Sequence, residues 1–136
     1  MNYAFTAHCV AVEDCDGTMV ISLADHAETP THWLILQRAR HYDAQDARLG
    51  MDCVHLQTGH ATAACYGGIR SMALCGDQLQ LSLSAQAQAV LGFSGAIEVA
   101  LADADNHCRL KAALADICKA ESIPLHQHPP SDRAPA

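Results

Sequence analysis

Apolar and polar residues alternate with a period of two over most of the first two-thirds of the chain, and turn dipeptides interrupt the alternation. This pattern is typical of antiparallel strands that have one face in a core and the other in solvent. Residues 3–13 and 18–24 flank Asp16-Gly17, which favours a two-residue hairpin turn because both residues tolerate positive φ. The pattern therefore predicts a β-hairpin at the start of the chain.

The segment 32–40 differs, because Trp33 to Leu36 are apolar without alternation. Such a run predicts a central strand that is covered on both faces. Gly67-Gly68 is open to two interpretations, a loop that approaches a ligand or a turn between two strands, and the turn is the commoner reason for paired glycines. Further strands are expected at 53–57, 61–66, 69–75, 78–83 and 97–101, with a hairpin turn at Gly76-Asp77.

Three segments have helical features. Asp43 is placed to cap a short helix near 43–49, with Asp46 in the first turn and Gly50 at the end. Residues 85–91 are rich in alanine and glutamine and precede Gly92, which favours a helix that ends there. From residue 103 onward, apolar residues recur at helical spacing and predict one buried face, made of Leu110, Ala113, Leu114, Ile117 and Cys118.

These elements predict an α+β fold: a hairpin-rich antiparallel sheet of about seven or eight strands, with the two short helices and a C-terminal amphipathic helix packed on the sheet. A chain of 136 residues is long enough for one continuous core, and we expect a single domain over residues 1–122. Residues 123–136 contain four prolines and no periodicity, which predicts a disordered tail.

The formal charge of −7 argues against binding to nucleic acid, because phosphate contacts require clustered Lys and Arg. No apolar run approaches the roughly 20 residues that span a bilayer, so no membrane insertion is expected. The seven cysteines are odd in number and irregularly spaced, and no signal-like segment opens the chain, which favours a reducing cytoplasm. We expect Cys15 to be exposed and the other six to be small buried hydrophobes, namely Cys9, Cys53, Cys65, Cys75, Cys108 and Cys118.

Nine histidines beside seven cysteines raise the possibility of a metal site or of a Cys/His-dependent hydrolase. The residues on which either would centre are Cys53, His55, His60 and Cys65. Scattered core cysteines and surface histidines are the simpler interpretation, because the sequence has no C-x-x-C pair and no H-x-x-x-H on a predicted helix. The chain also has no G-x-S-x-G, Walker or H-E-x-x-H motif, and we expect neither catalysis nor a cofactor.

The stretch LQRARHYDAQDARLGMD, followed about fourteen residues later by YGGI, resembles immunity protein family 10 of bacterial polymorphic toxin systems. The matching pattern comprises Leu36-Gln37-Arg38, Asp43-x-Gln45-Asp46, Leu49-Gly50-Met51-Asp52 and Tyr66-Gly67-Gly68. The resemblance implies a small cytosolic, non-catalytic protein that binds and neutralises a cognate toxin domain. The acidic charge is compatible with steering toward a basic toxin surface.

The candidate toxin-binding residues are polar or aromatic and lie in or near the matching pattern: Arg38, Tyr42, Asp43, Gln45, Asp46, Asp52 and Tyr66. Each also has a structural alternative. Asp43 and Asp46 suit helix capping, and Arg38 suits an ion pair with Asp43, Asp46 or Asp52. A third hypothesis is a non-catalytic scaffold module that forms a homodimer through a sheet edge.

Overall fold

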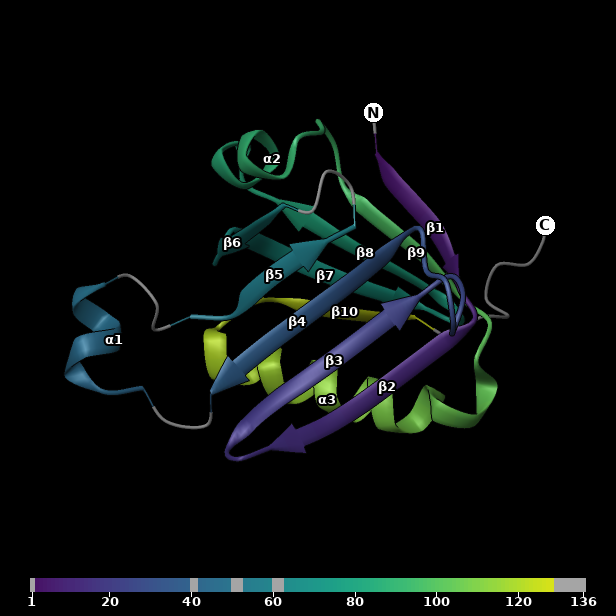
Figure 1. Ribbon diagram of the computed structural model, residues 1–136, viewed down its shortest axis with the longest axis horizontal. Coiled ribbons are helices and arrows are strands. Elements are labelled where there is room, and N and C mark those ends of the chain that lie inside the picture. The colour runs from purple at the N-terminus through teal and green to yellow at the C-terminus, as the bar shows by residue number, and fades with distance from the viewer. Residues whose placement is uncertain (1, 40–41, 50–52, 60–62, 129–136) are drawn as a thin grey trace.

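The computed structural model describes residues 2–39, 42–49, 53–59 and 63–128, which form ten strands and three α-helices (Figure 1). The first sheet consists of β1 (Tyr3–Ala7), β9 (Ile97–Leu101), β8 (Gln78–Leu83), β7 (Ile69–Cys75) and β10 (Leu125–His128), in that order. The second consists of β2 (Cys9–Cys15), β3 (Thr18–Ala24), β4 (Trp33–Ala39), β5 (His55–Thr58) and β6 (Ala64–Tyr66). The helices are α1 (Ala44–Arg48), α2 (Ala85–Leu91) and α3 (His107–Glu121), the last preceded by a 3-10 turn at Ala104–Asn106.

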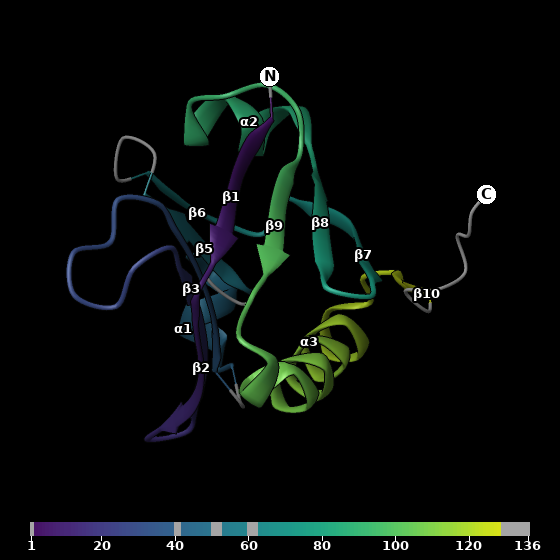
Figure 2. The same ribbon diagram turned by 90° about the vertical axis from the view of Figure 1, so that its right-hand side faces the viewer.

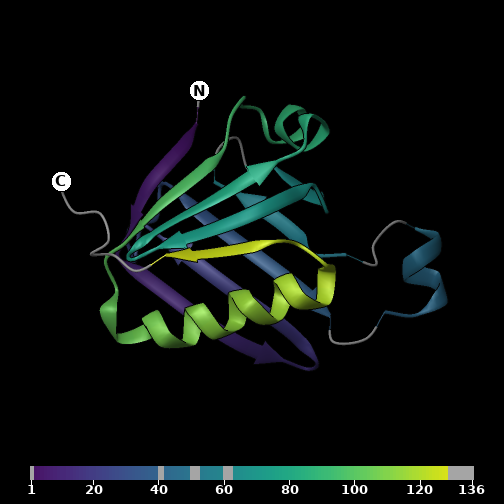
Figure 3. The same cartoon turned by 180° about the vertical axis from the view of Figure 1, so that it is seen from behind.

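The two sheets face each other, and α3 lies along the open side between them (Figure 2). Seen from behind, α3 runs beside β10 of the first sheet and across β2 and β3 of the second (Figure 3). Its five buried residues are the five that the helical spacing predicts. They join one core with side chains such as Leu34 and Leu36 of β4 and Leu79 and Leu81 of β8, all fully buried. Each such leucine stabilises the fold by roughly 1.5–3 kcal/mol.

The α+β class is confirmed, but the strands are more numerous than predicted and lie in two sheets rather than one. Residues 3–13, predicted as one strand, divide at His8: β1 pairs in parallel with β9, and β2 pairs antiparallel with β3. The core-facing residues lie at odd positions in β1, as at Tyr3 and Ala7, and at even positions in β2, as at Val10. The sequence pattern shows neither this change of phase nor which sheet each segment joins. The predicted hairpin turns at Asp16-Gly17 and Gly76-Asp77 are confirmed.

The segment 32–40 forms the middle strand of its sheet, as predicted, but the expected cover on both faces is wrong. Leu34 and Leu36 point into the core, whereas Trp33, Ile35 and Gln37 point to the other side and are half-buried. Among the described residues, no helix or strand lies over that side (Figure 1). Ile35 makes the run apolar without being part of the core.

The predicted start of the disordered tail is also wrong. Leu125–His128 forms β10 and pairs in parallel with residues 72–75 of β7. Just before this strand, the Met72 N–H donates to the Pro124 carbonyl at 3.0 Å, an ordinary length for a backbone hydrogen bond. The sequence did not predict this strand, because the segment is rich in proline and a parallel pairing with a distant partner leaves no local signal. Residues 129–136 lie outside the described part of the chain.

The cysteine prediction holds only in part. Cys118 is buried, and burial raises the pKa of its thiol to about 11. Cys9, Cys53 and Cys65 are half-buried, whereas Cys75 and Cys108 are exposed, contrary to prediction. The two exposed thiols lie at the end of a strand and on the solvent side of α3, where a small side chain is tolerated without burial. The Cys15 side chain is not among those the structure describes.

Gly67-Gly68 is a crossing between the sheets and not the predicted hairpin turn, because β6 belongs to the second sheet and β7 to the first. Both glycines have positive φ, 72° and 90°. The Gly67 N–H donates to the Val54 carbonyl at 2.8 Å, and the Ser84 N–H donates to the Gly68 carbonyl at 2.8 Å. A Cβ at Gly68 would lie 2.5 Å from the Ala87 Cβ, so α2 packs directly on this backbone.

We predict that Gly68→Ala destabilises the protein by about 2–4 kcal/mol, for two reasons. An alanine at this position is strained by the positive φ, and its Cβ collides with α2, which must move to relieve the contact. Gly17→Ala is the matched control, since Gly17 has a φ of 83° and open space around its would-be Cβ. It should cost only about 1 kcal/mol. Urea unfolding measures both, and equal losses would contradict the close packing of α2 on the crossing.

Candidate functional site

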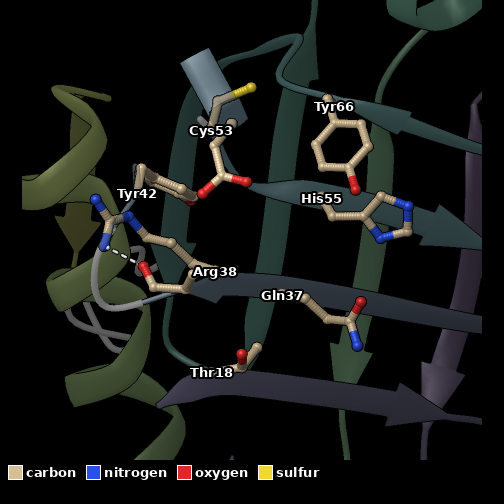
Figure 4. Close-up of a pocket in the computed structure, with 9 residues that line it drawn as sticks. Thr18, Gln37, Arg38, Tyr42, Cys53, His55 and Tyr66 are labelled. Atoms are coloured by element: carbon tan, nitrogen blue, oxygen red, sulfur yellow. Dashed lines mark hydrogen bonds between the residues drawn. The ribbon is translucent and has the colours of Figure 1, made fainter. Parts of the chain in front are cut away.

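A pocket of about 190 Å³ opens at one end of the second sheet, next to α1 (Figure 4). It brings together four of the seven predicted contact residues: Arg38, Tyr42, Asp46 and Tyr66. The other lining residues are Thr18, Gln37, Ala39, Cys53 and His55. Asp43 and Gln45 are exposed on α1 and its cap and do not line the pocket, and Asp52 lies outside the described residues.

The helix at the mouth of the pocket begins as the sequence predicts. The Asp46 N–H donates to Asp43 Oδ1 at 2.8 Å, and the Asp43 N–H donates to Asp46 Oδ2 at 3.0 Å, which together form a capping box. None of the residues of α1 is buried, and Leu49 at its end is 62% exposed. The helix therefore stands away from the core (Figure 1), and its shape depends on its cap rather than on packing. The predicted stop at Gly50 lies outside the described residues.

Arg38 has a structural partner that the sequence did not indicate. Its Nε donates to Glu121 Oε2 at 2.7 Å, at the last residue of α3, and its Nη1 donates to the Ala39 carbonyl at 3.0 Å. Its Cζ lies 4.9 Å from the centre of the Tyr42 ring, within cation–π distance. The expected ion pair with Asp43 or Asp46 is wrong. Arg38 instead ties the end of β4 to the end of α3.

Tyr42 shares that arrangement, because its O–H donates to Glu121 Oε2 at 3.5 Å. Burial of the phenol and, second, the negative charge of Glu121 raise the pKa of Tyr42 to about 12. Its hydroxyl is therefore protonated at neutral pH and serves as a donor. Tyr42, Arg38 and Glu121 form a small network that holds one wall of the pocket.

The opposite wall comes from the outward side of neighbouring strands. Gln37 of β4 lies opposite His55 of β5, which in turn lies opposite Tyr66 of β6. The His55 and Tyr66 rings are 4.8 Å apart between centroids. His55 Nδ1 is buried and has no hydrogen-bond partner among the described atoms, and Tyr66 is 44% exposed. Sequence reasoning did not select Gln37 or Thr18 as site residues, although strand alternation places both on the outward side.

Of the four residues of the Cys/His hypothesis, Cys53 and His55 both line the pocket, whereas Cys65 does not. The strand register places Cys65 opposite Leu56, on the inner side of the sheet, whereas His55 points outward with Tyr66. Burial raises the pKa of the Cys65 thiol, which disfavours a nucleophilic thiolate. His60 lies outside the described residues, and within the described ranges no three His, Cys, Asp or Glu side chains are grouped for a metal ion.

The chain is thus a small α+β protein of two packed sheets, with a polar pocket at one end of the second sheet. The family model of Immunity protein 10 matches residues 6–109, so the chain belongs to that family. The match includes every residue that lines the pocket and stops before the buried face of α3. No curated protein and no solved structure matches the chain. None of the helices in the described ranges is long and apolar enough to cross a membrane.

Arg38→Ala should destabilise the protein by about 1–3 kcal/mol, because it leaves the Glu121 carboxylate, with a side chain only 10% exposed, without its cation. Adding Glu121→Gln should recover part of the loss by removing the unpaired charge. Arg70→Ala, at an exposed arginine of β7, is the control and should stay within about 0.5 kcal/mol of the parent protein. Chemical unfolding measures all three, and a loss for Arg38→Ala no larger than the control's would contradict the ion pair's role.

The raised pKa of Tyr42 predicts a loss of stability at alkaline pH. An unfolded tyrosine ionises near pH 10, whereas the folded protein holds this proton to about pH 12. The stabilisation that Tyr42 gains from its raised pKa is therefore complete below pH 10 and declines as the pH rises from about 10 to about 12. Unfolding free energies measured across this range should fall less steeply for Tyr42→Phe than for the parent protein. Parallel slopes would show that Tyr42 ionises like an exposed phenol.

Proposed function

We propose that this protein acts in the cytoplasm, where it binds a cognate toxin domain and neutralises it without catalysing a reaction. The observation that carries the proposal is the match to Immunity protein 10, which extends over the second sheet, over β7, β8 and β9 of the first, and over the whole pocket. The geometry supports it, because the described residues form a polar and aromatic pocket in which Tyr66 is exposed. Binding is the activity that such a surface favours.

The seven predicted contact residues fall into different roles under this proposal. Tyr66, Asp43 and Gln45 are exposed and are available for direct contact. Tyr42 and Asp46 are half-buried in the pocket wall, so they offer an edge or an oxygen rather than a whole side chain. Arg38 acts chiefly through Glu121 and positions the wall. Asp52 stays a candidate from the sequence alone.

Charge supports a basic partner. The chain carries a formal charge of −7, and the pocket end of the molecule presents the carboxylates of Asp43 and Asp46 on an exposed helix. Arg38 does not offset them, because Glu121 already pairs with it. A toxin surface rich in Lys and Arg would be attracted to this end and would associate faster at low ionic strength.

Co-expression with the toxin domain encoded beside this chain's gene tests the proposal. We expect the protein to restore growth of cells that produce the toxin domain, and the two purified proteins to form a complex on size-exclusion chromatography. Light scattering of the protein alone tests the homodimer hypothesis at the same time. Persisting lethality together with the absence of a complex would disprove the proposal, and a reaction catalysed by the protein alone would favour the enzyme alternative.

A further inference from the structure

The outward side of the second sheet carries two complete rows of paired residues. Each row contains one residue from each of the five strands. The first, which we call the Tyr66 ladder, consists of Glu13, Val20, Gln37, His55 and Tyr66. The second consists of Ala11, Ser22, Ile35, Gln57 and Ala64. Only Glu13, at the edge, carries a formal charge. Trp33, the sole tryptophan of the chain, lies on the same side of β4.

The outward side of the first sheet provides an internal comparison. Its central row, which we call the Gln80 ladder, consists of Ala4, Glu98, Gln80, Ala73 and His126. The outward sides of both sheets carry few charges. That of the first sheet presents small or polar side chains, whereas that of the second sheet presents Trp33, Ile35, Val20 and Tyr66. Protein interfaces are enriched in aromatic residues and depleted of charge at their centres. The second sheet has this composition and the first does not.

The Tyr66 ladder is also continuous with the pocket, because Gln37, His55 and Tyr66 belong to both. Inside it, the buried Nδ1 of His55 has no partner among the described atoms. A buried polar atom without a partner destabilises the protein, and a ligand group that forms a hydrogen bond with it removes that cost. The ladder thus combines apolar contact area with an unused hydrogen-bonding position.

We propose that the outward side of the second sheet, centred on the Tyr66 ladder, is the surface on which the toxin domain docks. This inference rests on the proposed function and adds the chemistry of the partner. The toxin surface is expected to have an uncharged patch that can form hydrogen bonds, bordered by Lys and Arg side chains. The uncharged patch of the toxin faces the two ladders of this chain. The basic border faces the carboxylates at the pocket end, contributed by Glu13, Asp16, Asp43 and Asp46.

A second copy of this chain is a poorer occupant of the same surface. Two copies related by a twofold axis present the same patch to each other, so neither copy supplies a basic border to meet the acidic border of the other. Arg48 of α1 is an exposed cation at this end, but it stands beside several carboxylates, and the charge of Arg38 is already paired with Glu121. The acidic border is therefore matched better by a partner of opposite charge than by a second copy of this chain.

Gln37→Lys and Gln80→Lys form a matched pair for the test. Each glutamine lies in the middle strand of its sheet, on the outward side, and each substitution adds the same side chain. Affinity for the toxin domain encoded beside this chain's gene is measured by calorimetric titration. We expect Gln37→Lys to weaken binding at least about tenfold, because it places a desolvated charge in the docking surface, and Gln80→Lys to change it by less than about twofold.

Tyr66→Ala is the second variant, and it should also weaken binding at least about tenfold, since exposed tyrosines at an interface centre contribute strongly. Thermal unfolding confirms that all variants are folded. Hydroxyl-radical footprinting of the parent complex adds a measurement that needs no variant, in which Trp33 and Tyr66 should be protected from oxidation.

The outcomes separate the inference from the proposed function. If the parent protein neither binds nor rescues, the proposed function fails. If it binds, but Gln37→Lys and Gln80→Lys bind alike and Trp33 stays unprotected, the function stands and this docking surface is wrong. A parent homodimer that Gln37→Lys dissociates, with toxin binding unchanged, would also overturn the inference and assign the surface to a second copy.

Discussion

The shared core between the two sheets is the interaction on which the rest of the molecule depends. Each sheet buries one side against the other, and α3 closes the gap that they leave. The side of each sheet that faces the core is mainly apolar, whereas the opposite side is free of that constraint. The outward side of the second sheet, with its mixture of aromatic, aliphatic and amide side chains, exists because the inward side alone supplies the packing energy.

The local features of the fold were readable from the sequence because each depends on neighbouring residues. The cap at Asp43, the end of α2 at Gly92 and the buried face of α3 follow from spacing within one or two helical turns. The features that were missed depend on distant partners. The division at His8, the crossing at Gly67-Gly68 and the parallel pairing of β10 join segments separated by many residues, and alternation carries no information about the partner strand.

The same distinction applies to the candidate site. Arg38, Tyr42, Asp46 and Tyr66 were selected from the sequence and do lie around one pocket. Their roles were not readable, because Glu121 lies far along the chain from Arg38 and no local pattern joins them. Gln37 and His55 were placed on strands, but their position opposite each other is a property of register, which the sequence did not specify. Residue identity thus indicated residues that line one pocket, and long-range pairing decides which contacts each side chain makes there.

The family match ends before the part of α3 that packs in the core. The match stops at Arg109, yet all five buried residues of α3 come after it, as do Glu121 and β10. The unit that folds is therefore longer than the unit whose sequence is recognisable. A helix that only fills space requires apolar residues of suitable volume rather than particular ones, and cores tolerate such exchanges when volume is kept. For this chain, a boundary drawn at the end of the family match would therefore cut through the core.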